Sequence, residues 1–158
     1  MLRHTRLAVL AGIASIFLLQ PLLEAKDARI DYSQLQRSLS SLLECQKDLM
    51  AWVGARVGSL EFEITNDLVD AISTAFNYIK AIEGLYTITE MCSCQSALVS
   101  RYLQSEIQNY MQLLENRLEV INLSLSRAKS SVVEDAGLRA RTEIRNTLEM
   151  LRQFNQMP

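Results

Sequence analysis

The chain has 158 residues, of which 49% are hydrophobic and 22% are charged, and its formal net charge is −2. This length supports one hydrophobic core and is short for two ordinary domains. A mildly acidic protein has no general electrostatic attraction for nucleic acid, so no nucleic-acid partner is expected.

Proline and histidine occur only near the ends, at His4, Pro21 and Pro158. Because proline disrupts helix interiors, the long proline-free stretch predicts an all-α protein. Histidine is the commonest metal ligand and the usual proton shuttle near neutral pH. Its absence from residues 5–158 argues against di-iron sites, haem sites and histidine-based hydrolysis. We therefore expect a non-enzymatic protein with no catalytic residues, no metal and no cofactor.

The first 25 residues have the order of a secretory signal. Arg3 and Arg6 precede an apolar run at 7–19, and Pro21 and Ala25 follow it. The run is short compared with the ~20 residues that span a membrane. We expect a signal peptide over residues 1–25, cleaved after Ala25, and a single helical-bundle domain over 26–158. The protein is then exported, periplasmic or extracellular, and touches a membrane only if the signal stays uncleaved as an anchor.

The first expected helix begins at Ser33, which forms a capping-box spacing with Gln36, and ends near Gly54. Its apolar positions recur at steps of three and four, which is typical of a helix face packed on a core. The following segment, 60–64, alternates apolar and charged residues, but no second strand is available to pair with it. We expect residues 60–64 to form an extended loop.

The second expected helix begins around residues 65–67 and ends at Gly84, a typical helix C-terminus. Thr87 and Glu90 form a second capping-box spacing, so the third helix is expected to begin at about Ile88. This third helix runs to about residue 128 and is the longest, at about 40 residues.

A fourth helix is expected to begin where Ser131 and Glu134 form another capping-box spacing, although Gly137 offers a second possible boundary. Short connections favour antiparallel neighbours over bundles with long crossovers. The sequence therefore predicts an elongated antiparallel up-down bundle of about four helices, with coiled-coil-like packing.

Three cysteines, Cys45, Cys92 and Cys94, predict one disulfide and one leftover thiol in an oxidising compartment. The expected turns bring Cys45 to about the level of residue 97, so Cys45–Cys94 is the preferred pair and Cys45–Cys92 the second choice. Cys92 and Cys94 alternatively form a redox pair, although residues two apart point to opposite sides of a helix.

The third expected helix carries a second apolar shoulder beside its core face. Its residues are Tyr102, Leu113, Val120 and Leu123, with Arg117 among them. Mixed apolar and charged surfaces of this kind bind proteins, so we expect a protein partner or self-association through this helix.

Together these features predict an exported, non-enzymatic helical bundle that acts through protein–protein contacts. Envelope assembly, chaperone-like holding and a part in a secretion or conjugation apparatus all fit this class. Two alternatives remain open: a bundle that binds a small ligand between its helices, and a thiol–disulfide redox protein that uses Cys92 and Cys94.

Overall fold

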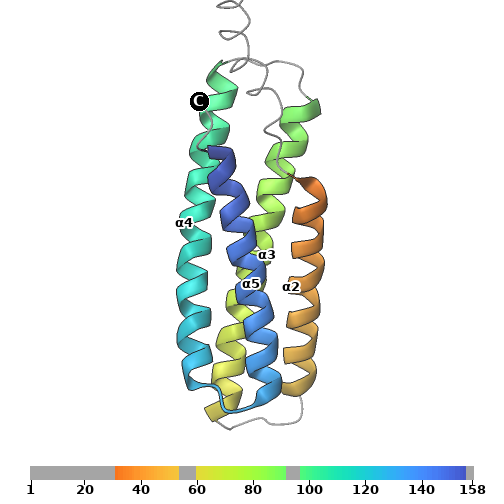
Figure 1. Ribbon diagram of the computed structural model, residues 1–158, viewed down its shortest axis with the longest axis vertical. Coiled ribbons are helices and arrows are strands. Elements are labelled where there is room, and N and C mark those ends of the chain that lie inside the picture. The colour runs from red at the N-terminus through yellow and green to blue at the C-terminus, as the bar shows by residue number, and fades with distance from the viewer. Residues whose placement is uncertain (1–30, 54–59, 92–96, 156–158) are drawn as a thin grey trace, which may run out of the picture.

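The computed structural model describes residues 31–53, 60–91 and 97–155, and all regular secondary structure in these ranges is helical. The helices are α2 (Tyr32–Val53), α3 (Leu60–Met91), α4 (Ala97–Arg127) and α5 (Ser131–Asn155). They form a bundle that is longer than it is wide (Figure 1). The prediction of an all-helical bundle of about four helices is confirmed for this part of the chain. The expected signal peptide, 1–25, lies outside the described residues.

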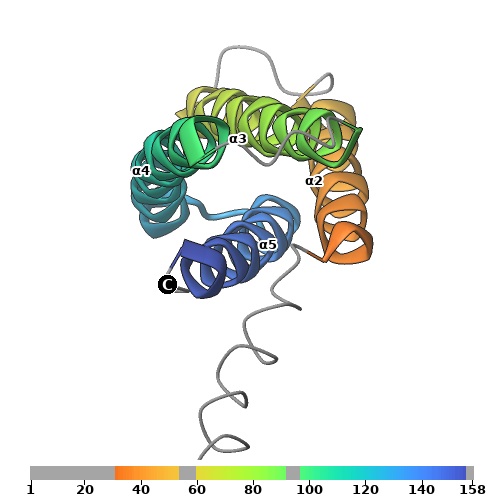
Figure 2. The same cartoon turned by 90° about the horizontal axis from the view of Figure 1, so that it is seen from above.

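The four helices surround one core, and each lies beside two others (Figure 2). α2 packs against α3 and α5, and α4 packs against the same two helices from the opposite corner. Between α2 and α3, the Tyr32 hydroxyl lies 3.0 Å from Thr87 Oγ1. Gln46 Nε2 donates to Ser73 Oγ at 2.7 Å. Residue numbers therefore rise along α2 as those of its neighbours on α3 fall.

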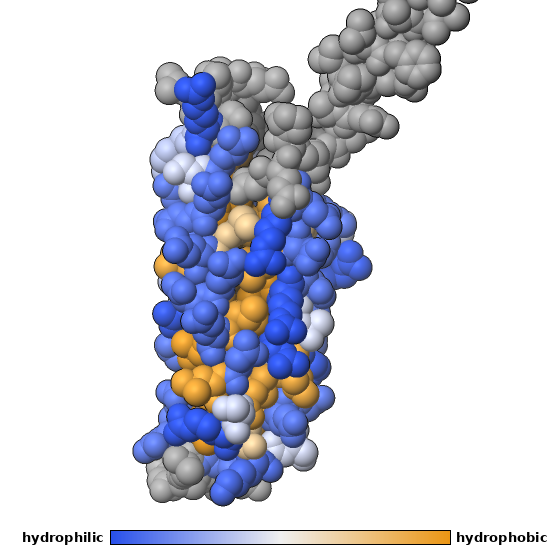
Figure 3. Space-filling view, turned by 60° about the vertical axis from the view of Figure 1, so that its left-hand side comes forward, coloured by the Kyte–Doolittle hydropathy of each residue, from blue (hydrophilic) through white to orange (hydrophobic). Residues whose placement is uncertain are grey.

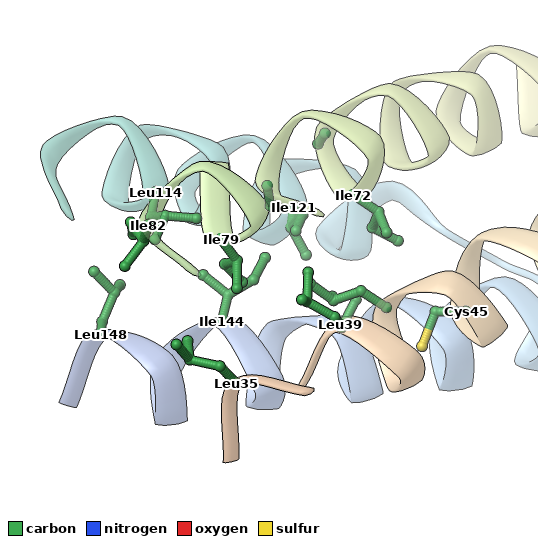
Figure 4. Packing of buried hydrophobic residues seen from close by; sticks show 14 of the residues in the cluster. Leu35, Leu39, Cys45, Ile72, Ile79, Ile82, Leu114, Ile121, Ile144 and Leu148 are labelled. Carbon is green, nitrogen blue, oxygen red and sulfur yellow. The ribbon is translucent and has the colours of Figure 1, made fainter. Parts of the chain in front are cut away.

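The core consists of the apolar stripes that the sequence predicts. Figure 4 shows Leu35, Ile79 and Ile144 pointing toward one another from α2, α3 and α5. The stripe positions that are buried are Leu35, Leu39, Leu42, Leu49, Leu68, Ile72, Ala75, Ile79, Ile82, Leu103, Ile107, Leu114, Ile121, Ala140, Ile144, Leu148 and Leu151. Removing apolar side chains from water is the main favourable term in folding, so these stripes stabilise the bundle.

The start of α2 differs from the prediction of a Ser33 cap. α2 begins at Tyr32, and the carboxylate Oδ1 of Asp31 accepts hydrogen bonds from the backbone N–H groups of Ser33 (2.9 Å) and Gln34 (3.2 Å). Aspartate is among the best N-cap residues, because it pairs backbone donors that have no partner within the helix. The predicted end near Gly54 is confirmed, since α2 ends at Val53.

The expected loop at 60–64 is wrong, because α3 begins at Leu60. Residues four apart share a helix face, and Ile64 is buried one turn before buried Leu68. The hydroxyl of Thr65 donates to the carbonyl of Glu61 at 2.6 Å, a bond typical of a helix interior.

The expected break at Gly84 is also wrong, because α3 continues to Met91. The hydroxyl of Thr87 donates to the carbonyl of Glu83 at 2.9 Å, as in a helix interior, so Thr87 does not cap a new helix. An isolated glycine lowers helix stability by only about 1 kcal/mol, which the packing of a long helix overrides.

These boundaries change the lengths of the helices. α4 has 31 residues and α3 has 32, so the third expected helix is not the longest of the described helices. The predicted start of the last helix is confirmed, since α5 begins at Ser131. Gly137 lies inside α5 rather than at a boundary, and a Cβ added there would come within 2.7 Å of Leu125 Cδ2. A glycine at this position therefore allows α4 and α5 to approach closely.

Candidate functional site

The predicted shoulder lies on α4, along its boundary with α3. The rings of Tyr78 on α3 and Tyr110 on α4 are 5.8 Å apart, which marks the edge of α4 that faces α3. Leu113 and Arg117 follow Tyr110 by three and seven residues, so they lie along the same edge. Val120 continues this edge.

The five shoulder residues differ in exposure. Tyr102 and Leu123 are each 62% exposed. Leu113, Arg117 and Val120 are half-buried, and Val120 packs against the core. Tyr102 and Leu123 are 21 residues apart, or about 31 Å along the helix. The structure therefore places the five residues along one helix but leaves only its two ends strongly exposed.

Apolar side chains are also visible on the side of the bundle where α4 lies, as a strip between two rows of polar side chains (Figure 3). An ion pair joins α4 to α5, with Arg152 Nη2 2.6 Å from Glu115 Oε1. Leu118 and Leu125 of α4 are half-buried. Part of the boundary between α4 and α5 is thus closed by contacts within the chain.

The structure reveals a second apolar surface, which the sequence interpretation missed. It is centred on the hydrogen bond between Gln46 of α2 and Ser73 of α3. Positions three or four residues from a given residue share its helix face. They are Leu43 and Met50 on α2 and Val69 and Phe76 on α3, which together we name the α2–α3 seam.

The α2–α3 seam has a core-facing layer and an exposed layer. Val69 and Phe76 are partly buried and pack against the core, whereas Leu43 is 40% exposed and Met50 is 57% exposed. Leu43 lies level with Phe76, and Met50 lies level with Val69, because their offsets from the Gln46–Ser73 bond are equal and opposite. The exposed α2 side chains therefore lie beside apolar side chains of α3.

One signal in the sequence points to this surface. Phe62, Val69 and Phe76 are seven residues apart, and so are Leu43 and Met50. A seven-residue repeat of apolar residues is typical of a helix-packing seam. Placing residues 60–64 in a loop removed Phe62 from helix α3 and left this repeat unnoticed.

Cys45 lies on the buried side of α2, next to α5. Burial raises the pKa of its thiol, and Asp48 and Asp135 act in the same direction, whereas Arg139 acts against them. Because the thiolate is the reactive form of cysteine, a buried thiol with a raised pKa is a poor nucleophile.

A pocket near Cys45 lies between the end of α2 and the start of α5. It is lined by Asp48, Ala51, Ser131, Val132, Asp135 and Arg139. The Arg139 guanidinium lies 2.6 Å from Asp48 Oδ2 and 3.0 Å from Asp135 Oδ2. The hydrogen bond to Asp48 is the main reason that the pKa of Arg139 is raised. Two carboxylates thus neutralise the cation that would otherwise attract an anionic ligand.

The turn expected after Gly84, which brought Cys45 level with residue 97, is wrong because α3 continues to Met91. Ser73, the hydrogen-bond partner of Gln46, is 18 residues from the end of α3 at Met91, which is about 27 Å along the helix. Cys45 is therefore level with the middle of α3 and not with residue 97. Cys45 is a free thiol, while Cys92 and Cys94 lie outside the described residues. The pairing itself stays a prediction.

Among residues 31–53, 60–91 and 97–155, no group of histidine, cysteine, aspartate or glutamate side chains is arranged to hold a metal ion. None of the helices described in these ranges combines the length and apolarity needed to cross a bilayer. No family model, curated protein or solved structure matches the chain.

Proposed function

We propose that this chain is an exported, non-enzymatic helical bundle that acts through protein–protein contacts. The observation that carries the proposal is the exposure of large apolar side chains on α4, where Tyr102 and Leu123 are each 62% exposed. Aromatic and aliphatic side chains of this size contribute much of the binding energy when a partner covers them.

The rest of the α4 shoulder supports the proposal. Arg117 is half-buried, and its Nε atom is buried without a hydrogen-bond partner within the described part of the chain. Arginine among apolar residues is enriched at the centres of protein interfaces. The expected partner is a protein with apolar side chains and an acceptor for the Arg117 guanidinium.

The proposal includes an up-down antiparallel order of the helices. Contacts of Tyr32 with Thr87 and of Gln46 with Ser73 support this order for α2 and α3. For α4 and α5, the pair formed by Arg152 and Glu115 supports it, since α5 near its end meets the middle of α4. Export rests on the signal-like order of residues 1–25.

Site-specific photocrosslinking in the producing cell tests the function. A photoreactive phenylalanine analogue at Tyr102 or Leu123 is expected to give one discrete adduct, identified by mass spectrometry. The matched control replaces Arg37, an exposed residue of α2 on another face of the bundle. The proposal fails if both α4 positions give no adduct, or only the diffuse products that the Arg37 position also gives.

Charge substitution separates binding from folding. Leu123→Glu and Tyr102→Glu alter side chains that are mostly exposed, so helical content is expected to stay at the wild-type level. Each variant is expected to lower the affinity for the partner identified by crosslinking at least tenfold, which corresponds to about 1.4 kcal/mol. A complex of unchanged strength in both variants would remove the α4 shoulder from the interface.

A further inference from the structure

The α2–α3 seam carries a second inference, which does not depend on the α4 shoulder. We propose that two copies of this chain associate through their α2–α3 seams around a two-fold axis parallel to the helices. The seam is the four residues Leu43, Met50, Val69 and Phe76, arranged around the bond between Gln46 and Ser73.

The heights of the seam residues along the helix axes allow two copies of this surface to pack on each other. Rotation about a two-fold axis parallel to the helices places α2 of one copy over α3 of the other at the same height. Leu43 of one copy then meets Phe76 of the other, and Met50 meets Val69, because these residues are already level within one chain. Exposed aliphatic side chains of α2 are thus covered by apolar side chains of α3.

The charges on this surface match in the same arrangement. Lys47, directly after Gln46, and Asp70, three residues before Ser73, are both exposed. Neither takes part in an ion pair with another described residue. Lys47 is level with residue 72, so in the dimer it lies within about 3 Å, along the axis, of the height of Asp70 on the second copy. The symmetry produces this pair twice.

The size of the face is of the order that an association requires. α2 has 22 residues and is about 33 Å long, and two helices of about 10 Å diameter are about 20 Å wide. Their product, roughly 650 Å², compares with about 800 Å² per partner in a stable complex. A second copy is therefore an occupant of suitable size. Leu43 and Met50 are seven residues apart, as are Val69 and Phe76, so the apolar residues on α2 of one copy have the same spacing as those on α3 of the other.

Sedimentation of the purified full chain under reducing conditions tests the proposal, with the reductant excluding disulfide-linked dimers. The wild type is expected to sediment as a dimer at about 100 µM. Met50→Glu puts a carboxylate into the seam and is expected to raise the dimer dissociation constant at least tenfold. The control Val132→Glu alters an exposed valine at the start of α5, outside the α2–α3 seam and the α4 shoulder, and is expected to leave the dimer unchanged.

Exchanging the charges at Lys47 and Asp70 tests whether these residues pair between the two copies. Lys47→Glu and Asp70→Lys are each expected to weaken the dimer, and the double variant is expected to restore it. Circular dichroism checks that each variant keeps wild-type helicity. A monomeric wild type, a dimer insensitive to Met50→Glu, or a double variant no stronger than the single ones would each overturn the proposal. The photocrosslinking result at Tyr102 and Leu123 is unaffected by any of these outcomes.

Discussion

The two hairpins of the bundle, α2–α3 and α4–α5, are held together differently. Glu61 of α3 holds the turn between α4 and α5, because its Oε1 accepts hydrogen bonds from the backbone N–H groups of Lys129 (2.9 Å) and Ser130 (2.7 Å). Gly137 then lets α5 approach Leu125 of α4. Specific contacts thus hold the turn of this hairpin, and a side chain at Gly137 requires Leu125 to shift.

The α2–α3 hairpin presents exposed apolar side chains of α2 beside apolar side chains of α3. Leu43 and Met50 are exposed beside Val69 and Phe76, and nothing lies within 4 Å of a Cβ added at Gly84. The α4–α5 hairpin thus has its turn held by specific contacts within the chain, whereas the α2–α3 hairpin has an apolar surface formed jointly by its two helices. Self-association through the α2–α3 seam and binding of a partner protein through the α4 shoulder therefore use different parts of the bundle.

The largest expected effect is on the reactivity of Cys45, which reports whether the α2–α3 hairpin separates from α5. The thiol is fully buried and its pKa is raised. Alkylation therefore requires opening of the structure, and its rate is expected to be at least about a thousandfold lower than in urea. Peptide mapping by mass spectrometry gives the rate for Cys45 separately from Cys92 and Cys94.

The same mapping decides the cysteine pairing. In the unfolded chain without reductant, Cys45 is expected to be labelled as a free thiol, as in the structure. If Cys45 is labelled only after reduction, it is part of a disulfide, and the disulfide-linked peptide identifies Cys94 or Cys92 as its partner.

The next largest effect is on stability, through the turn between α4 and α5. Glu61→Ala removes the acceptor of two backbone hydrogen bonds at the turn between α4 and α5. The free energy of unfolding, measured with urea, is expected to fall by about 1–3 kcal/mol, because the donors lose a charged partner. Glu63→Ala alters an exposed neighbour and is expected to change stability by less than about 0.5 kcal/mol. Equal effects of the two variants would contradict the role of Glu61.

Alanine substitutions at Gly84 and Gly137 compare how much space each hairpin leaves for a side chain. Alanine at either position gains about 0.5–1 kcal/mol of helix propensity. Gly84→Ala is therefore expected to stabilise the protein, whereas in Gly137→Ala the contact with Leu125 is expected to cancel the gain and cost about 1–2 kcal/mol relative to Gly84→Ala. Urea unfolding of both variants measures the difference, and two equal gains would show that Leu125 moves aside freely.

The smallest expected effect is at the start of α2. Hydrogen bonds from Ser33 and Gln34 hold the pKa of Asp31 below its ordinary value of 3.8. Because this pKa is lowered in the folded state, the carboxylate stabilises the fold fully above its ordinary pKa of 3.8. It loses this effect as the pH falls through the lowered pKa. Asp31→Ala is expected to be less stable than the wild type at pH 7.

The pH dependence tests the cause of this effect. The difference between the wild type and Asp31→Ala is expected to shrink when unfolding is measured below pH 3.8. Asp31→Asn, which still caps but carries no charge, serves as the control and is expected to keep most of its stability at both pH values. A difference that does not change with pH would show that the charge of Asp31 has no part in capping.

The sequence predicted the helix faces better than the helix ends. The stripe of Leu68, Ile72 and Ile79 follows from a period that any packed helix must have, and it is buried as expected. The ends depend on short motifs that also occur inside helices. Thr87 satisfies a capping-box spacing, yet its hydroxyl bonds to Glu83 within α3.

The candidate surfaces show the same limit. The α4 shoulder was found because its residues lie on one helix, where periodicity alone groups them. The α2–α3 seam combines residues of two helices, and grouping Met50 with Val69 requires the register of α2 on α3, which the Gln46–Ser73 bond reveals. The error at residues 60–64 hid the matching repeat on α3.

Hydrophobic spacing predicts that this protein is helical and which side of each helix faces the core, because the spacing is local and its energy is proportional to buried area. The tertiary structure was needed to show where α3 ends, which side chains meet across helices, and that Cys45 lies about 26 Å along α3 from the level of Met91. Register depends on the lengths of the helices and the positions of their turns, and packing between helices overrides weak local end signals such as Gly84.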